Sequence, residues 1–298
     1  MGKIVECVPN FSEGRDMKKV ERIIAPFIIT DGCKLLDYST DKDHNRAVVT
    51  VIGNPDCVRK AVVEAVGVAI NEIDMNKHTG GHPRMGAADV IPFIPIKDMD
   101  MEEAVILANE TAKDIADKYD LPIYLYEKAA ELKERENLAN VRKGQYEGLK
   151  EKIRKPEWKP DYGPSEVHPT AGAAIIGARM PLIAFNINLG TNERWIADKI
   201  AGCIRYISGG FRYTKAMGVD LEERGIVQVS INMTDFTRTA LYRVFETVKF
   251  EAKRYGAPVV GSEIIGLTPM EALVDSAVYY MQIEDFNMNQ VLESRLLE

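Results

Sequence analysis

Apolar residues recur at two different spacings along the chain, and each spacing predicts one kind of element. Ile23 and Ile24 lie three and four residues after Val20, which places all three on one face of an amphipathic helix. Residues 33–40 and 46–53 are instead continuous runs rich in apolar and β-branched residues, which are typical of strands. The polar sequence Asp-Lys-Asp-His-Asn between these runs favours a hairpin loop.

The same order of elements occurs twice. In the first half the patterns predict strand, helix, strand, strand, helix and strand at residues 3–11, 13–28, 33–40, 46–53, 54–73 and 89–96. In the second half they predict the same order at residues 181–189, 192–208, 213–221, 225–233, 234–256 and 258–266. A βαββαβ order used twice predicts an α/β (α+β) protein of two ferredoxin-like subdomains, residues 1–178 and 179–298. A ligand commonly binds where two such units face each other.

Several segments stand outside this repeat. A helix is predicted at 99–119, a short strand at 122–126 and a last helix at 268–281. The two prolines of the strand at 89–96 predict an edge strand or an irregular strand. Residues 142–179 are polar, basic and rich in Pro and Gly, so we expect an ordered connection between the two halves.

Composition narrows the class of protein. With 298 residues, 46% hydrophobic and 28% charged, the chain is expected to be soluble and globular. The net charge of -7 argues against a generic binder of nucleic acid or anionic membrane, although a local basic pocket for an anionic substrate stays compatible with it. We expect no transmembrane helix and no signal peptide. The four cysteines are scattered, which favours reduced thiols and a cytoplasmic location.

The candidate chemistry lies in the sequence "HTGGHPRMG", which holds His78 and His82. Two histidines four residues apart can bind a metal when a helix places both on one side, as in H-E-x-x-H. Here Thr-Gly-Gly separates them and no Glu is present, so we predict no metal site. His82 either satisfies a turn or performs acid–base chemistry, and the residues alone leave both hypotheses open. His78 looks like the solvated end of the preceding helix.

Three neighbours of His82 favour a functional loop. Gly80 and Gly81 permit a close backbone approach to a ligand. Arg84 is a cation suited to a carboxylate. Longer sequence motifs bear on the choice between the two hypotheses for His82.

Six such motifs are "ECVPNFSEG", "LLDYSTDKDHNRAVVTVIG", "HTGGHPRMGAADVIPFIPI", "YGPSEVHPTAGAAIIGAR", "LIAFNINL" and "PVVGSEIIGLTP". Together they resemble the glutamate formiminotransferase family, from Lys3 to about residue 280. The resemblance implies a transferase that moves the formimino group of N-formimino-L-glutamate to tetrahydrofolate, in histidine degradation and one-carbon metabolism. It also implies a homodimer whose subdomains pack around a folate tunnel, and a stand-alone form of a domain that relatives fuse to a cyclodeaminase, which could be a separate partner here.

The resemblance implies specific roles as well. His82 is the expected catalytic histidine, and Asp37 or Asp89 is the expected carboxylate that fixes its tautomer. We expect the substrate-binding residues to be Arg46, Arg84, Arg179, Asn186 and Asn188. The expected folate-binding loop is Gly163, Pro164, Ser165, Glu166, Val167, His168, Pro169, Thr170, Ala171 and Gly172. Tetrahydrofolate is expected as co-substrate.

Two other functions stay open at this point. One is a folate-dependent formyltransferase that uses N-formylglutamate, because the two donors differ only by O for NH. The other is a folate-binding module without catalysis, which His82 argues against.

Overall fold

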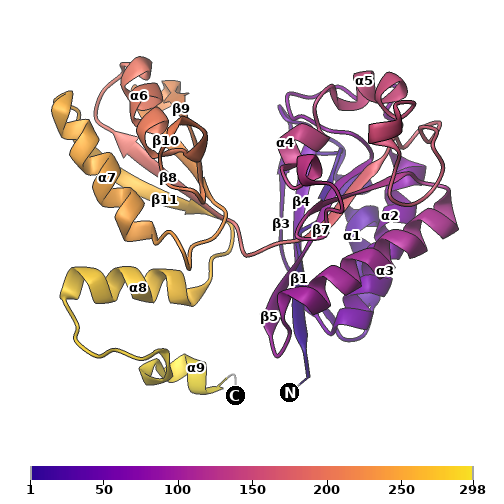
Figure 1. The fold of residues 1–298 in the computed structure, drawn as a ribbon, viewed down its shortest axis with the longest axis horizontal. Helices are drawn as coiled ribbons and strands as arrows, with labels where there is room; N and C mark the ends of the chain where they lie inside the picture. The colour runs from indigo at the N-terminus through magenta and orange to yellow at the C-terminus, as the bar shows by residue number, and fades with distance from the viewer. Residues whose placement is uncertain (1, 297–298) are drawn as a thin grey trace. The chain divides into compact units, whose positions relative to one another are not determined.

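The chain forms two compact units, Met1–Arg179 and Met180–Glu298, in a computed structural model that describes residues 2–296 (Figure 1). Each unit has its own sheet and its own buried core. Within the described residues, none of the helices combines the length and the apolar character that crossing a membrane requires.

The sheet of the first unit contains β1 (Ile4–Cys7), β2 (Asn10–Phe11), β3 (Cys33–Asp41), β4 (Arg46–Gly53), β5 (Ala88–Lys97), β6 (Ile123–Glu127) and β7 (Ala174–Ala178). β4 lies between β3 and the pair β1 and β2, and β5 lies on the other side of that pair, all antiparallel. This is the strand order of a ferredoxin-like βαββαβ unit, with its first and third strands adjacent. β7 and then β6 extend the sheet beyond β5 in parallel.

β5 is an inner strand, so the expectation of an edge strand was wrong, although the strand is irregular as expected. β5 pairs with β1 and β2 on one side and with β7 on the other. Pro92 lies opposite the break between β1 and β2. Its carbonyl accepts the N–H of Val8 at 3.2 Å, and no N–H is needed from the proline there. Pro95 lies next to the register shift at Ile4 and Val5. Each proline therefore occupies a position where the ladder tolerates a missing N–H.

Residues 142–179 belong to the first unit, which corrects the prediction that they connect the two halves. They contain α5 (Gln145–Lys152), the short helix η2 (Pro156–Trp158) and strand β7. The short helix η1 (Lys133–Arg135) and then α4 (Leu138–Val141) precede this segment. With α4, the segment forms a second apolar cluster with β5, β6 and β7. Because β7 is an inserted inner strand, this segment completes the sheet of the first unit.

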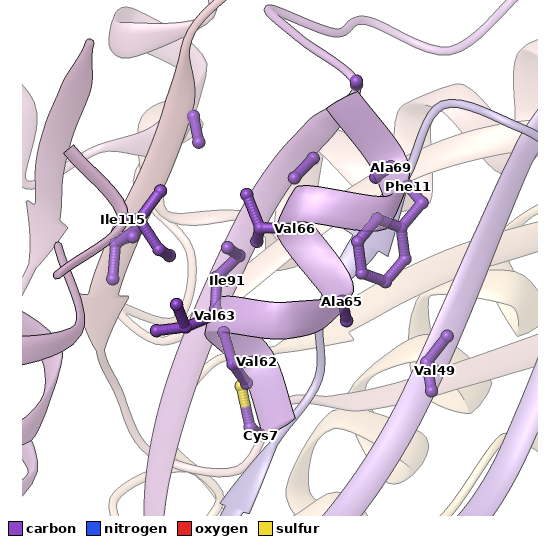
Figure 2. Close-up of a cluster of buried hydrophobic side chains, with 14 of the residues drawn as sticks. Cys7, Phe11, Val49, Val62, Val63, Ala65, Val66, Ala69, Ile91 and Ile115 are labelled. Carbon is purple, nitrogen blue, oxygen red and sulfur yellow. The ribbon is translucent and has the colours of Figure 1, made fainter. Parts of the chain in front are cut away.

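Three helices cover the opposite face of that sheet: α1 (Met17–Ile29), α2 (Pro55–Glu72) and α3 (Met101–Tyr119). Figure 2 shows apolar side chains of α2 beside those of β1, β2 and β5, namely Val62, Val66, Cys7, Phe11 and Ile91. Each fully buried side chain of this size stabilises the fold by about 1.5–3 kcal/mol.

Local signals set where these helices begin. Asn54 caps α2 by accepting the N–H of Asp56 at 3.0 Å, and Pro55 occupies the first turn, where no N–H is needed. Asp100 and Glu103 form a reciprocal capping box at the start of α3. The sequence therefore fixes the ends of these helices through short-range hydrogen bonds.

The second unit confirms the predicted repeat. Its strands are β8 (Ile183–Leu189), β9 (Thr214–Leu221), β10 (Ile226–Met233) and β11 (Val259–Ile265), all antiparallel in the order β11-β8-β10-β9. Its helices are α6 (Arg194–Ile204), α7 (Leu241–Arg254), α8 (Met270–Met281) and α9 (Leu292–Leu296), with short helices η3 (Tyr206–Ser208), η4 (Glu222–Arg224) and η5 (Met288–Gln290). α7 begins at Leu241, later than the predicted helix at 234–256, because the residues around Asp235 form a separate turn.

Candidate active site

His82 lies on the loop between α2 and β5, which packs against the turn between β3 and β4. The N–H of Gly81 donates to the carbonyl of Asp43 at 3.1 Å. A Cβ atom at Gly80 would lie 2.3 Å from the carbonyl oxygen of His44, so this position requires glycine. The backbone at Gly80 is thus in close contact with the protein's own turn between β3 and β4, and not with a ligand as predicted.

The expected folate-binding loop, residues 163–172, supports the histidine loop from the other side. The N–H of Met75 donates to Thr170 at 2.7 Å, and the N–H of Ala87 donates to Ala171 at 2.9 Å. His168 accepts the N–H groups of Thr170 and Ala171 at its Nδ1 atom, at 3.3 and 3.0 Å. The later half of the loop therefore uses its backbone inside the protein, whereas its earlier half, residues 163–166, is exposed.

Alternation along β4 directs Arg46 to the His82 side of the sheet. Ala47, Val49 and Val51 are buried in the core beneath the helices, so Arg46 points to the opposite face. Its Nη1 atom lies 3.3 Å from Nδ1 and 3.2 Å from Nε2 of His82. A guanidinium nitrogen nearly equidistant from both ring nitrogens lies over the ring, and does not form one linear hydrogen bond.

The surroundings keep His82 neutral. Burial lowers its pKa most, the positive charges of Arg46 and Arg142 lower it further, and the pKa is held at about 3. His82 therefore carries an available lone pair at neutral pH. A base with so low a pKa nevertheless attracts protons weakly.

This pKa sets a pH dependence that differs from the ordinary histidine value of about 6.5. His82 can accept a proton only in its neutral form. Because kcat/KM reports the free protein, it is lost only as pH falls through about 3, the pKa of His82 in the folded protein. We therefore expect kcat/KM to show no inflection near 6.5 from this group. A profile of kcat/KM between pH 5 and 8 checks this, and a single-proton fall centred near 6.5 that disappears in His82→Ala would contradict it.

Neither expected carboxylate contacts the His82 ring. Asp37 is exposed on β3. Asp89 is buried, accepts the N–H of Met85 at 2.7 Å with one oxygen and pairs with Arg142 through the other. A different carboxylate, Asp41, forms a hydrogen bond with a histidine of this site. Its Oδ2 atom lies 2.7 Å from Nδ1 of His44. The His44 ring meets the His82 ring edge-on, with centroids 6.3 Å apart.

Arg84 has a carboxylate partner within the protein, which differs from its expected role as a substrate ligand. Its side chain is only 7% exposed and forms a two-pronged pair with Glu147, at 2.9 and 2.7 Å. It also donates from Nε to Nδ1 of His78 at 3.2 Å. His78 places its Nε2 atom 3.1 Å from the carbonyl of Asn45, so His78 is half-buried and fixed, not solvated. A buried guanidinium requires such partners, and α5 supplies Glu147 while the loop supplies His78.

We expect Arg84→Lys to affect stability and not substrate affinity. Lysine cannot reproduce the two-pronged pair with Glu147, so the free energy of unfolding should fall by about 1–3 kcal/mol. Denaturant unfolding measures the loss, and KM for both substrates measures affinity. A stable variant with a much larger KM would restore the substrate role of Arg84.

Arg142 was missed by the sequence prediction, because it lies in the segment that was taken for a connection. It follows α4, pairs with Asp89 and adds a second positive charge beside His82. No local motif marks it, since it is one of many basic residues in that stretch.

The other expected substrate residues, Arg179, Asn186 and Asn188, have interactions of their own within their units. Arg179 follows β7, donates its N–H to Phe93 at 3.0 Å and lowers the pKa of Glu6, which burial raises. Asn186 and Asn188 lie on β8 of the second unit. Asn186 accepts the N–H of Ile231 at 3.3 Å, and buried Asn188 accepts from Gln228 at 2.8 Å. Both side-chain amides thus form hydrogen bonds within the sheet of the second unit.

The sequence predicted no metal site, and a chelator can test that prediction. Within the part of the chain that the structure describes, no three His, Cys, Asp or Glu side chains gather in a way that could hold a metal ion. We predict that turnover survives incubation with EDTA and dialysis. Loss of turnover that zinc restores would contradict this prediction.

The fold and the site together define a class: a protein of two ferredoxin-like units, the first of which holds a neutral histidine beside a cationic side chain. Residues 4–179 match the formiminotransferase domain, N-terminal subdomain, and residues 184–296 match the formiminotransferase domain. The chain belongs to the formiminotransferase family.

Three relatives show the extent of the similarity. A glutamate formimidoyltransferase of Streptococcus pyogenes serotype M1 is 52% identical over 298 residues, which is 100% of both chains. A glutamate formimidoyltransferase of Thermoplasma acidophilum is 45% identical over 98% of this chain and 97% of its own. The formimidoyltransferase-cyclodeaminase of Mus musculus is 44% identical over 95% of this chain but only 53% of its own length.

Proposed function

We propose that this protein is a glutamate formimidoyltransferase, which transfers the formimino group of N-formimino-L-glutamate to tetrahydrofolate and releases L-glutamate. One observation carries the proposal: 52% identity over the whole of both chains to a glutamate formimidoyltransferase. This supports the same reaction in histidine degradation, with tetrahydrofolate as co-substrate.

The residues of the site fit the proton movements of this reaction. The N5 amine of tetrahydrofolate attacks the formimino carbon, and a new C–N bond forms. The bond from that carbon to the glutamate nitrogen then breaks. Overall one proton leaves N5 and one reaches the departing glutamate nitrogen. A neutral His82 can accept the first proton and donate it to the second nitrogen, which is the general acid–base role we assign to it.

Arg46 is the candidate that this structure favours for a substrate carboxylate. It lies over the His82 ring, and no carboxylate of the described residues is within ion-pair distance of it. Arg84 and Arg142 each have a carboxylate partner already. The negative substrate can therefore supply the charge that the protein does not.

The direct test is product formation. The purified protein is mixed with N-formimino-L-glutamate and tetrahydrofolate, and the products are identified by mass spectrometry. We expect 5-formiminotetrahydrofolate and L-glutamate in equal amounts. Binding of tetrahydrofolate without any product would favour a non-catalytic folate-binding module and refute the proposal.

We also propose a homodimer located in the cytoplasm, on the basis of the family resemblance. The fused mouse relative supports a possible separate cyclodeaminase as a partner, because its name includes that second activity. Light scattering on the purified protein tests the oligomeric state, and a monomer at micromolar concentration would refute the homodimer.

A further inference from the structure

Three buried or half-buried arginines of the first unit each pair with a carboxylate. Arg84 pairs with Glu147, Arg135 pairs with Asp161, and Arg142 pairs with Asp89. Arg46 has no such partner among the described residues, and its polar contact is with the His82 ring. A half-buried guanidinium without a counter-charge is costly, so this exception calls for a physical explanation.

Asp89 does not supply the missing charge. One of its oxygens accepts the N–H of Met85 at 2.7 Å, and the other pairs with Arg142. The Nε atoms of both Arg46 and Arg142 are buried and have no hydrogen-bond partner. The charges of Asp89 and Asp41 act on Arg46 only from beyond ion-pair distance, which leaves a guanidinium without a paired carboxylate beside His82.

The charges of Arg46 and Arg142 both act on His82. After burial, the charge of Arg142 is the main cause that lowers the pKa of Arg46, and both charges lower the pKa of His82. A planar anion with two oxygens matches this arrangement, because guanidinium groups bind carboxylates through parallel hydrogen bonds.

The chemistry of the substrates selects one carboxylate. In N-formimino-L-glutamate the α-carboxylate is attached to the carbon that bears the reacting nitrogen. In tetrahydrofolate the carboxylates lie beyond the p-aminobenzoyl group, far from N5. A carboxylate held beside a histidine that acts on the reacting nitrogen is therefore the α-carboxylate of the donor.

We propose that Arg46 and Arg142 together bind the α-carboxylate of the formimino donor, and that this bound carboxylate enables His82 to take up a proton. The inference rests on the proposed function, because that function names the donor. Arg142 becomes a substrate-binding residue in addition to the partner of Asp89.

The second half of the proposal follows from the groups that face His82. These are Arg46 on β4, Arg142 after α4, and His44 with Asp41 at the turn between β3 and β4. Asp41, and to a smaller extent Asp89 on β5, offset part of the charge of Arg46. Binding of an anion between the arginines cancels one cause of the low pKa of His82. That pKa then rises toward the ordinary range, where a histidine transfers protons efficiently.

The test uses two unreactive ligands and the wild-type protein. N-acetyl-L-glutamate keeps both carboxylates of the donor, and N-acetyl-4-aminobutyrate lacks only the α-carboxylate. The chain has four histidines, so the ring signals of labelled histidine can be assigned by comparison with His82→Ala. We expect N-acetyl-L-glutamate to raise the pKa of His82 measured by NMR, and N-acetyl-4-aminobutyrate to bind about 10- to 100-fold more weakly and to leave that pKa low.

A variant locates the effect. Arg142→Gln should remove most of the difference in affinity between the two ligands, whereas Arg59→Gln, which removes the same charge from the surface of α2, should preserve it. Equal affinity of the two ligands for the wild type, or an equal shift of His82 by both, would overturn the proposal without any variant. Product formation with no discrimination between the ligands refutes this inference alone, and discrimination without product refutes the proposed function alone.

Discussion

Replacing His82 by alanine is expected to reduce kcat by about 10²–10⁴-fold, the usual contribution of positioned proton transfer. The imidazole contacts Arg46 and the His44 ring and is kept neutral, so it is the group prepared to accept a proton. Affinity for tetrahydrofolate should change little, because the substitution removes a proton acceptor. Steady-state turnover and equilibrium folate binding measure the two effects.

His78→Ala is the matched control, because it removes the other histidine of the same loop. His78 accepts from Arg84 and lies against the carbonyl of Asn45, so its loss should lower stability while the folded fraction keeps most of its turnover. Near-normal turnover of folded His82→Ala, or an equal loss in folded His78→Ala, would require another residue for the proton transfer.

Arg46→Gln is expected to reduce kcat/KM for the formimino donor by about 10²-fold. The substitution removes charge-assisted hydrogen bonds to the donor carboxylate, each of which contributes about 1.5–3 kcal/mol. KM for tetrahydrofolate should change much less. Initial rates with each substrate varied in turn separate these effects.

A second readout distinguishes this role from a structural one. The charge of Arg46 lowers the pKa of His82, so Arg46→Gln should move that pKa upward, and the acid limb of kcat/KM should move to higher pH. Arg46→Lys keeps the charge but loses the planar fork, so it should recover part of the rate and keep the low pKa. An unchanged kcat/KM in folded Arg46→Gln would exclude Arg46 from donor binding.

Most of the fold was predictable because it depends on local signals. The spacing of Val20, Ile23 and Ile24 gave helix α1, and the Asn-Pro start of α2 fixed its first turn. The prolines of β5 led to the wrong prediction of an edge strand, because whether a strand is inner or outer depends on partners that are distant in the sequence. Strand β7 was missed for the same reason: its five residues become a strand only by pairing with β5 and β6.

The site was predictable only in part. The glycines and proline around His82 marked the loop, and the Thr-Gly-Gly between His78 and His82 was the reason to predict no metal site. The partners of each side chain were not readable, since they come from distant parts of the chain. Arg84 is paired with a glutamate 63 residues away, and Asp89 with an arginine 53 residues away. Sequence motifs therefore singled out His82, and the structure shows that Arg46 beside it has no carboxylate partner among the described residues.

The most direct test of the central claim compares kcat/KM for N-formimino-L-glutamate and N-formylglutamate, with tetrahydrofolate saturating and wild-type protein. The two donors have the same carboxylates and differ only by NH for O at the transferred group. The account predicts efficient turnover of the formimino donor, with a much smaller kcat/KM for the formyl donor. A higher kcat/KM for N-formylglutamate, or no turnover of the formimino donor at all, would contradict it.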